Sequence, residues 1–247
     1  MVKAVIFDCC NTLLCYQSQE EKTGIWEMMA KAVEYILEKK LQIVPEELER
    51  LYQELCDKEI RDCQKRRGSY AEMRLRNVWR NVLQALDIPL EIAEEKSEDI
   101  LLIHRLYARK KKRLFPNVGD ELIKLKKNGM KLLLLSNAQT CFLYNELPEE
   151  IRNIFDEIII SEVAGIKKPD ENIFCLAFEK LGVEPEHVVV VGDSMEDDII
   201  PARKFGCQCI RIGKRERMKN TLSRIAVFDP YQQSGYAGLS ELIVNMS

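Results

Sequence analysis

Five short apolar runs constrain the fold of this chain most. They are Val2–Phe7, Met130–Leu135, Glu157–Ile160, Val188–Val191 and Cys207–Ile212, and a weaker run lies at residues 225–228. Runs of this length and character are typical of the buried strands of a parallel sheet. Polar residues follow each run, and most are then followed by a segment with helical spacing. This alternation predicts an α/β fold with a doubly wound, mainly parallel, Rossmann-like sheet.

The alternation is interrupted directly after the first strand. Between residues 19 and 113 the pattern is helical throughout. It predicts helices over 25–37, from Pro45 to Arg67, from an N-cap at Ser69 to about Leu86, and from Pro89 to Lys112. We therefore expect a discontinuous core domain of residues 1–16 and 114–247, with an inserted all-α domain of residues 17–113. The linkers near residues 15–18 and 113–116 would act as its hinges.

Charge and cysteine content narrow the function classes. A formal net charge of -3 gives no reason to expect nucleic acid as a partner. No apolar stretch is long enough to span a membrane, and the N-terminus lacks the pattern of a signal peptide. The nine cysteines form no CxxC pair and there are only two histidines, which argues against a zinc site. We expect a cytoplasmic protein with reduced thiols, as a monomer or a homodimer.

Polar side chains stand where the predicted strands end. The residues are Asp8 after the first strand, Ser136 and Asn137 after the second, Lys168 in the loop after the third, and Asp193 after the fourth, with Asp198 about one helical turn later. Parallel strands bring their carboxyl ends to one edge of a sheet, so we expect these side chains to lie together. Carboxylates, a hydroxyl and an amine in one place can hold a metal ion and an anion.

The chemistry of such a site favours phosphate. An aspartate nucleophile and a phosphoryl group repel each other, and Mg²⁺ between Asp8 and Asp193 would offset that repulsion. Lys168 would add a second positive charge, and the Ser136 hydroxyl could hold a phosphate oxygen. Each residue taken alone has an ordinary interpretation as a helix cap, a turn residue or a solvated lysine. All of them together at strand ends favour a functional site.

Four motifs resemble those of the haloacid dehalogenase-like (HAD) hydrolase superfamily. They are Asp8-x-x-x-Thr12-Leu13, Leu135-Ser136-Asn137, Lys168-Pro169-Asp170, and Gly192-Asp193-Ser194 with the later Asp198. The resemblance covers the chain nearly end to end, and the helical block lies where that family inserts a helical (C1-type) cap. It implies a hydrolase, most simply a phosphomonoesterase acting on a small phosphorylated metabolite. Asp8 would be the nucleophile and would form an aspartyl-phosphate that water hydrolyses.

The resemblance also assigns the remaining roles. It implies Mg²⁺ held by Asp8, Asp193 and the backbone carbonyl of Cys10, with Asp198 supporting the shell of the metal. Phosphate would be bound by Thr12, Ser136, Asn137 and Lys168, and the catalytic residues would be Asp8, Ser136 and Lys168.

The chain departs from the family pattern at Cys10. Phosphatases of this type carry a second Asp there, which acts as general acid and base. A thiol with a pKa of about 8.5 is a poor proton donor to a departing alkoxide, and general acid–base help is worth about 10²–10⁴ in rate. We therefore expect slow turnover or a restriction to good leaving groups. Asn11 stands where the family usually has Gly, and Asn tolerates the left-handed backbone region.

Two alternatives remain open. A 2-haloacid dehalogenase also lacks the second Asp, because halide leaves without a proton. Dehalogenases need no Mg²⁺ and do not keep the Gly-Asp-Ser motif, so Asp193 and Asp198 favour phosphate chemistry. The second alternative is a phosphoryl-binding protein with little or no catalysis. It would bind Mg²⁺ and phosphate while turnover stayed at background.

Overall fold

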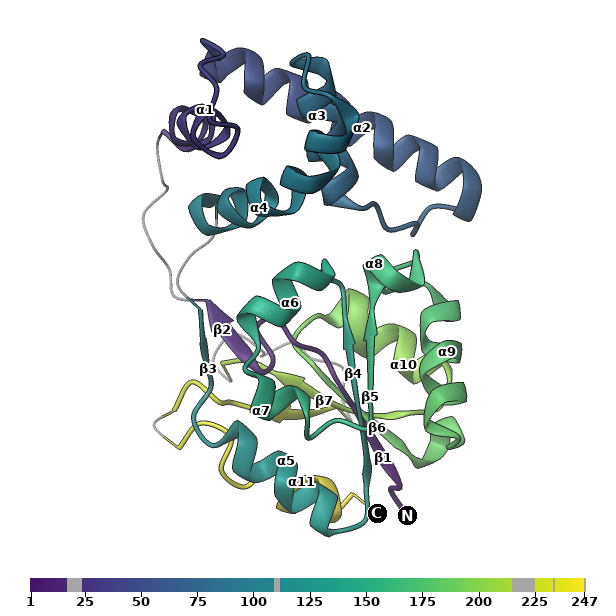
Figure 1. Ribbon diagram of the computed structural model, residues 1–247. Helices are drawn as coiled ribbons and strands as arrows, with labels where there is room; N and C mark the ends of the chain where they lie inside the picture. The colour runs from purple at the N-terminus through teal and green to yellow at the C-terminus, as the bar shows by residue number, and fades with distance from the viewer. Residues whose placement is uncertain (17–23, 109–111, 215–224, 233, 247) are drawn as a thin grey trace. The chain divides into compact units, whose positions relative to one another are not determined.

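The computed structural model describes residues 1–16, 24–108, 112–214, 225–232 and 234–246. The chain divides into two compact units, each described here by itself (Figure 1). The α/β unit comprises Met1–Tyr16, Lys112–Ala138 and Tyr144–Ser247. The helical unit comprises Gln17–Lys111 together with the short segment Gln139–Leu143.

A six-stranded sheet forms the centre of the α/β unit. Its strands are β1 (Ala4–Phe7), β4 (Lys131–Ser136), β5 (Glu157–Ile160), β6 (Val188–Gly192), β7 (Gln208–Ile212) and β8 (Ala226–Phe228). The spatial order is β5-β4-β1-β6-β7-β8, and every neighbouring pair is parallel. All residues of β1 and β6 are buried, as expected for strands covered on both faces. The predicted α/β fold with a doubly wound parallel sheet is confirmed.

Helices cover both faces of this sheet. They are α5 (Val118–Lys127), α9 (Glu171–Leu181), α10 (Ile200–Lys204) and α11 (Leu239–Val244), while the short helices α6 (Thr140–Glu146), α7 (Glu149–Arg152) and α8 (Ser161–Ala164) belong to the segments that join β4 to β5 and β5 to α9. On one face, Ala4 and Ile6 of β1 pack with Phe174 of α9 and Ala202 of α10. Helices α5 and α11 pack together on the opposite side (Figure 1). Alternate residues of each strand therefore pack into two separate apolar layers, one on each face of the sheet.

The described residues of the helical unit form α1 (Ile25–Ile36), α2 (Pro45–Arg67), α3 (Leu75–Ala85), α4 (Leu90–Ala108) and the first residues of α6. Its core contains Met29 and Val33 from α1 and Val78 and Val82 from α3, each pair four residues apart on one helix face. Fully burying such a side chain contributes about 1.5–3 kcal/mol.

The predicted start of the third helix at Ser69 is wrong. Helix α3 begins at Leu75, after an extended Arg74. The backbone N–H of Leu75 donates to Oε1 of Gln139, and Nε2 of Gln139 donates to the carbonyl of Met73. A side chain 64 positions away therefore supplies the bonds at this helix start, and local sequence pattern carries no sign of it.

Short strands stand where linkers were expected, and the predicted end of the fourth helix at Lys112 is wrong, because a strand begins at that residue. Strand β2 (Leu14–Tyr16) pairs antiparallel with β3 (Lys112–Leu114), and Arg113 Nε donates to Cys15 Sγ at 3.3 Å. Three residues are too few to show strand periodicity, and the two strands lie almost 100 residues apart in the chain. Residues 17 and 18 of the expected first hinge lie outside the described residues.

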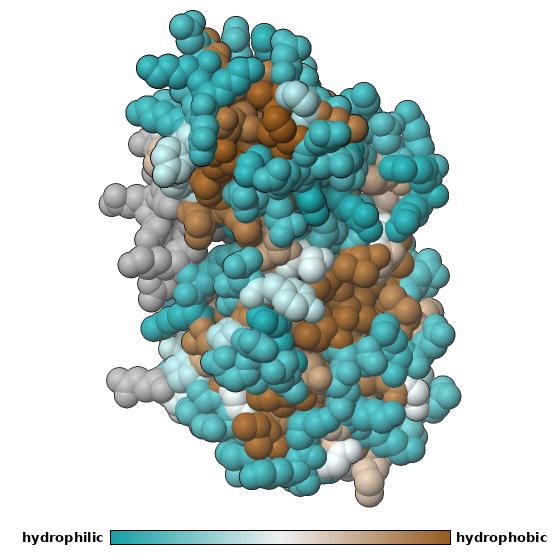
Figure 2. Space-filling view, viewed as in Figure 1, coloured by the Kyte–Doolittle hydropathy of each residue, from teal (hydrophilic) through white to brown (hydrophobic). Residues whose placement is uncertain are grey.

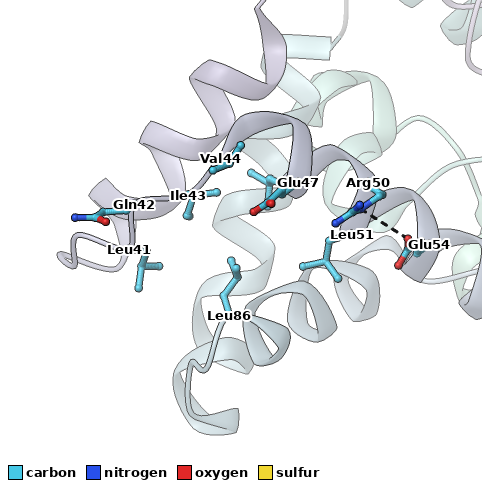
Figure 3. A pocket seen from close by; sticks show the side chains of 10 residues that line it. Leu41, Gln42, Ile43, Val44, Glu47, Arg50, Leu51, Glu54 and Leu86 are labelled. Atoms are coloured by element: carbon cyan, nitrogen blue, oxygen red, sulfur yellow. Dashed lines mark ion pairs between the residues drawn. The ribbon is translucent and has the colours of Figure 1, made fainter.

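Hydrophobic side chains reach the surface in patches on both units (Figure 2). One cavity of about 350 Å³ lies in the helical unit. Its apolar lining includes Leu41, Ile43 and Leu86, and the charged side chains Glu47, Arg50 and Glu54 also border it (Figure 3). None of the motif residues lines this cavity. In the described part of the chain, no helix is both long and apolar enough to cross a membrane.

Candidate active site

The carboxyl ends of the central strands bring three acidic residues together. Strand β1 pairs with β6 up to Phe7 and Val191, and the N–H of Asp8 continues the ladder by donating to the Val191 carbonyl at 2.9 Å. Asp193 directly follows β6. Asp8, Asp193 and Asp198 each offer one carboxylate oxygen, and these oxygens all lie within 4.8 Å of one another. The three carboxylates expected near the strand ends therefore lie together in the structure.

Lys168 is the positive centre of this cluster. Its Nζ donates to Asp8 Oδ1 at 2.7 Å and to Asp198 Oδ1 at 2.6 Å, and the side chain is only 3% exposed. Burial alone would lower the pKa of Lys168, but the charges of Asp198 and Asp8 outweigh burial and raise it. The ammonium group therefore stays protonated. A buried charge of this kind is tolerated because both of its partners are ionisable and hydrogen-bonded.

Asn137 contacts the main chain of Lys168. Its Oδ1 accepts from the Lys168 N–H at 2.9 Å, and its Nδ2 donates to the Lys168 carbonyl at 3.0 Å. From the sequence we expected this amide to contact phosphate. Two of its hydrogen-bonding positions are committed to the loop that carries Lys168, so Asn137 holds the backbone of that loop, and its contact with phosphate stays a prediction.

A π-helical turn brings Asp198 back to the strand end. Residues Met195–Ile199 form this turn, and Ser194 caps it by accepting from the N–H of Asp197 at 3.0 Å. Asp198 Oδ2 accepts from the N–H of Ser194 at 3.0 Å, while its Oδ1 accepts from Lys168. Both oxygens of Asp198 therefore already have protein partners. π turns of this kind are frequent at functional sites.

The electrostatics of the cluster favour a cation. Burial, followed by the charges of Asp8 and Asp198, raises the pKa of Asp193 to about 7. Burial also raises the pKa of Asp198, although Lys168 acts in the opposite direction. Burial is the largest cause of both pKa shifts, and repulsion between the acidic groups adds to it. A divalent cation would remove that repulsion.

A tight turn follows Asp8. The carbonyl of Cys9 accepts from the N–H groups of Leu13 at 2.8 Å and Leu14 at 3.0 Å. Asn11 has a φ of 59°, in the left-handed region that Asn tolerates. Contact with the Cys10 thiol, and then burial, raise the pKa of the Cys9 thiol. One residue reaches this turn without any sequence signal: the hydroxyl of Tyr236 donates to the carbonyl of Thr12.

Three buried oxygens of the site have no hydrogen-bond partner. They are Asp8 Oδ2, Thr12 Oγ1 and Ser136 Oγ, and the fourth such atom among the described residues is Trp79 Nε1 in the helical unit. Buried polar atoms are nearly always paired, so these three oxygens are candidates for contacts with a bound ion or anion.

These residues fit the magnesium ion that the resemblance implies. Mg²⁺ prefers hard oxygen ligands, commonly one or two carboxylates together with substrate phosphate oxygens. Asp8 and Asp193 each offer a carboxylate oxygen within 4.8 Å of the other, and the charge of Asp193 is opposed by two acidic neighbours. The hydroxyls of Thr12 and Ser136 are suited to the oxygens of an anion.

Comparison with known proteins adds the family and its relatives. Residues 2–206 match the family model of haloacid dehalogenase-like hydrolases. The chain is 27% identical to the glyceraldehyde 3-phosphate phosphatase of Methanothermobacter thermautotrophicus, over 94% of this chain and 98% of the relative. It is 32% identical to phosphoglycolate phosphatase 1 of Pseudomonas aeruginosa, over 48% of this chain and 44% of the relative.

Solved structures share the architecture. A 2-haloacid dehalogenase from Pseudomonas syringae superposes with a TM-score of 0.70 at 24% identity, over the full length of both chains. A HAD phosphatase from Thermococcus onnurineus superposes with a TM-score of 0.57 at 23% identity, over 98% of both chains. Because proteins of two different activities superpose, the fold alone does not choose between them.

Proposed function

Since the chain belongs to the haloacid dehalogenase-like hydrolase family, we propose that it is a Mg²⁺-dependent phosphomonoesterase acting on a small phosphorylated metabolite, with Asp8 as the nucleophile. One observation carries this proposal: the carboxylates of Asp8, Asp193 and Asp198 lie together, Lys168 binds Asp8 and Asp198, and Asp8 Oδ2 is buried without a partner. The relatives named as phosphatases support the substrate class. All nine cysteines are free, which suits the reducing cytoplasm in which we place the protein.

The two oxygens of Asp8 have different tasks in this mechanism. Lys168 holds Oδ1, so the carboxylate is fixed with Oδ2 available for attack. Oδ2 attacks phosphorus, the bond to the leaving alcohol breaks, and an aspartyl-phosphate forms. Water then attacks phosphorus and releases phosphate, which restores Asp8. A Mg²⁺ ion held by Asp8, Asp193 and the Cys10 carbonyl would offset the negative charge of the phosphoryl group.

The other unpartnered groups of the site would bind phosphate. The hydroxyls of Ser136 and Thr12 would donate to phosphate oxygens, and Lys168 would supply a fixed positive charge close to them. Asp198 holds Lys168 in place, and Asn137 holds its backbone. In this proposal both residues position Lys168, Asn137 also contacts the phosphate, and Asp198 supports the shell of the metal.

Cys10 limits the proposed reaction. The leaving alkoxide needs a proton, and Cys10 stands where a second Asp would donate it. We propose slow turnover, best with leaving groups of low pKa. The same residue favours a second candidate, 2-haloacid dehalogenation, in which halide leaves without a proton. A third candidate is phosphoryl binding with background turnover.

The experiment measures phosphate release from small phosphomonoesters, including glyceraldehyde 3-phosphate, phosphoglycolate and p-nitrophenyl phosphate, with and without Mg²⁺. We expect Mg²⁺-dependent turnover that Asp8→Asn abolishes and that Cys10→Asp raises by about 10²-fold or more. Wild type and both variants are compared at equal folded concentration. No release by any form, even from the activated ester, would overturn the proposal. Halide release from 2-haloacids would then favour the second candidate.

A further inference from the structure

The C-terminal part of the chain reaches the turn that carries the nucleophile. Tyr236 is fully buried, its hydroxyl donates to the carbonyl of Thr12, and the two residues lie 224 positions apart. The N–H of Tyr236 also donates to the carbonyl of Pro116 at 2.9 Å. Tyr236 lies beyond residues 2–206, the part of the chain that matches the family. The family pattern therefore assigns it no role.

Three separate segments meet at this point. The N–H of Phe115 donates to the carbonyl of Leu13 at 3.0 Å, which joins the turn to the segment that follows β3. Asn117 Nδ2 donates to the carbonyl of Ser234 at 2.9 Å, which joins that segment to the C-terminal residues. The fit is close: a Cβ on Gly235 would lie 2.4 Å from the carbonyl oxygen of Pro116. The turn is therefore held from a second side.

The C-terminal residues are themselves firmly attached. Glu121 of α5 is 1% exposed, and its Oε2 accepts from Ser240 N at 2.8 Å and from Ser240 Oγ at 2.7 Å. The Tyr236 ring packs against Phe115 and Phe228, with centroid separations of 5.9 and 5.7 Å. Residues 234–240 are thus anchored before and after Tyr236, so its hydroxyl has a fixed position.

Burial keeps the Tyr236 hydroxyl a donor. It raises the pKa of Tyr236, and the charges of Asp8 and Asp193 act in the same direction. The hydroxyl therefore stays protonated at neutral pH and donates one hydrogen bond to the turn. Loss of that bond would leave the Thr12 carbonyl buried and unpaired.

We propose that Tyr236 is a positioning residue, which holds the turn of residues 8–12 in the arrangement that presents Asp8, the Cys10 carbonyl and Thr12 to their ligands. The catalytic consequence rests on the proposed function. The structural part, that the Tyr236 hydroxyl fixes this turn, does not.

The test compares Tyr236→Phe with Tyr144→Phe, which removes a hydroxyl from a side chain of the same unit that is 53% exposed. Amide hydrogen exchange of peptides covering residues 9–14 is measured in wild type and both variants. Mg²⁺ binding is measured by calorimetry without substrate, and kcat and KM are measured with p-nitrophenyl phosphate. The loss of one hydrogen bond corresponds to about a three- to tenfold change in an equilibrium constant.

We expect Tyr236→Phe to speed exchange in residues 9–14 by about three- to tenfold, with β6 and β7 unchanged. Mg²⁺ affinity and kcat should fall by a similar factor while KM stays constant, and Tyr144→Phe should match wild type. Unchanged exchange in residues 9–14, or equal acceleration throughout the α/β unit, would overturn the proposal. Failure of the proposed function shows separately, as wild type that neither binds Mg²⁺ nor releases phosphate.

Discussion

Gly192 leaves no room for a side chain, because Asp198 folds back against it. A Cβ at this position would lie 2.4 Å from both Cγ and Oδ2 of Asp198. We expect Gly192→Ala to cost about 1–3 kcal/mol of stability through overpacking. It should also lower kcat/KM by about tenfold or more, because Asp198 would shift and release Lys168. Thermal unfolding and phosphate release measure the two effects.

Gly119→Ala is the matched control for this substitution. Gly119 lies in α5 and its new Cβ would approach only the terminal Cδ1 of Ile151, at 3.1 Å. The flexible end of an Ile side chain can yield, and Ala is favoured over Gly in a helix by about 1 kcal/mol. We expect wild-type activity and equal or higher stability. If Gly192→Ala also keeps wild-type activity and stability, the close packing of Gly192 against Asp198 is not needed for function.

Which acidic residues of the site lie together could be predicted from the strand ends, but the contacts of other residues at the site could not. Asp8 and Asp193 follow buried strands, so their convergence could be predicted from topology. The contacts of Asn137 could not, because its partner is the main chain of Lys168, 31 residues away. Tyr236 carries no motif at all, and its partner lies at the other end of the sequence. Contacts of this range depend on tertiary packing and leave no local pattern.

Among the elements, long periodic helices and buried strands were predicted well. Pro45 and Gly68 mark the ends of α2, as the turn chemistry of these residues requires. Errors fall where a distant segment decides the structure. The start of α3 at Leu75 depends on Gln139. The β2–β3 pair depends on two segments that the whole helical unit separates.

In the helical unit, His104 makes stability depend on pH. Its ring packs against Trp26, Tyr52 and Trp79, with centroid separations of 5.1, 4.9 and 5.4 Å. Burial lowers the pKa of His104 to about 4, below the ordinary value of 6.5. The unfolded chain therefore takes up a proton first as pH falls. The free energy of unfolding therefore keeps its full value above pH 6.5. It falls by at most about 3 kcal/mol as pH is lowered to about 4.

Urea unfolding followed by tryptophan fluorescence measures this effect. Both tryptophans of the chain, Trp26 and Trp79, lie in the helical unit, so the signal reports on that unit. His104→Phe keeps an aromatic ring and should flatten the loss of stability between pH 6.5 and 4. His187→Gln removes the other histidine, which lies in the α/β unit, and should leave the loss intact. An equally steep loss in His104→Phe would contradict the assignment.

At the scale of the whole molecule, every residue of the proposed metal and phosphate site belongs to the α/β unit. The binding free energy of Mg²⁺ should therefore add to the stability of that unit. A ligand at 100 times its dissociation constant stabilises the folded state by about 2.7 kcal/mol. For a domain of this size that corresponds to an increase of about 5–10 °C in the unfolding temperature. Far-UV circular dichroism with increasing MgCl₂ measures the shift, and KCl at equal ionic strength is its control.

The size of this shift should itself depend on pH, because Mg²⁺ and a proton compete for Asp193. Without metal, the folded-state pKa of about 7 lies above the ordinary 3.8. Protonated Asp193 therefore stabilises the folded state at low pH, and this stabilisation is lost as pH rises from 3.8 to about 7. At pH 5.5 only about one molecule in 30 has this carboxylate ionised, so apparent Mg²⁺ affinity should be about 30-fold weaker than at pH 8. Asp193→Asn removes the competing proton together with the ligand charge, and should show little stabilisation at either pH. Equal stabilisation of wild type at both pH values would mean that Asp193 does not hold the metal.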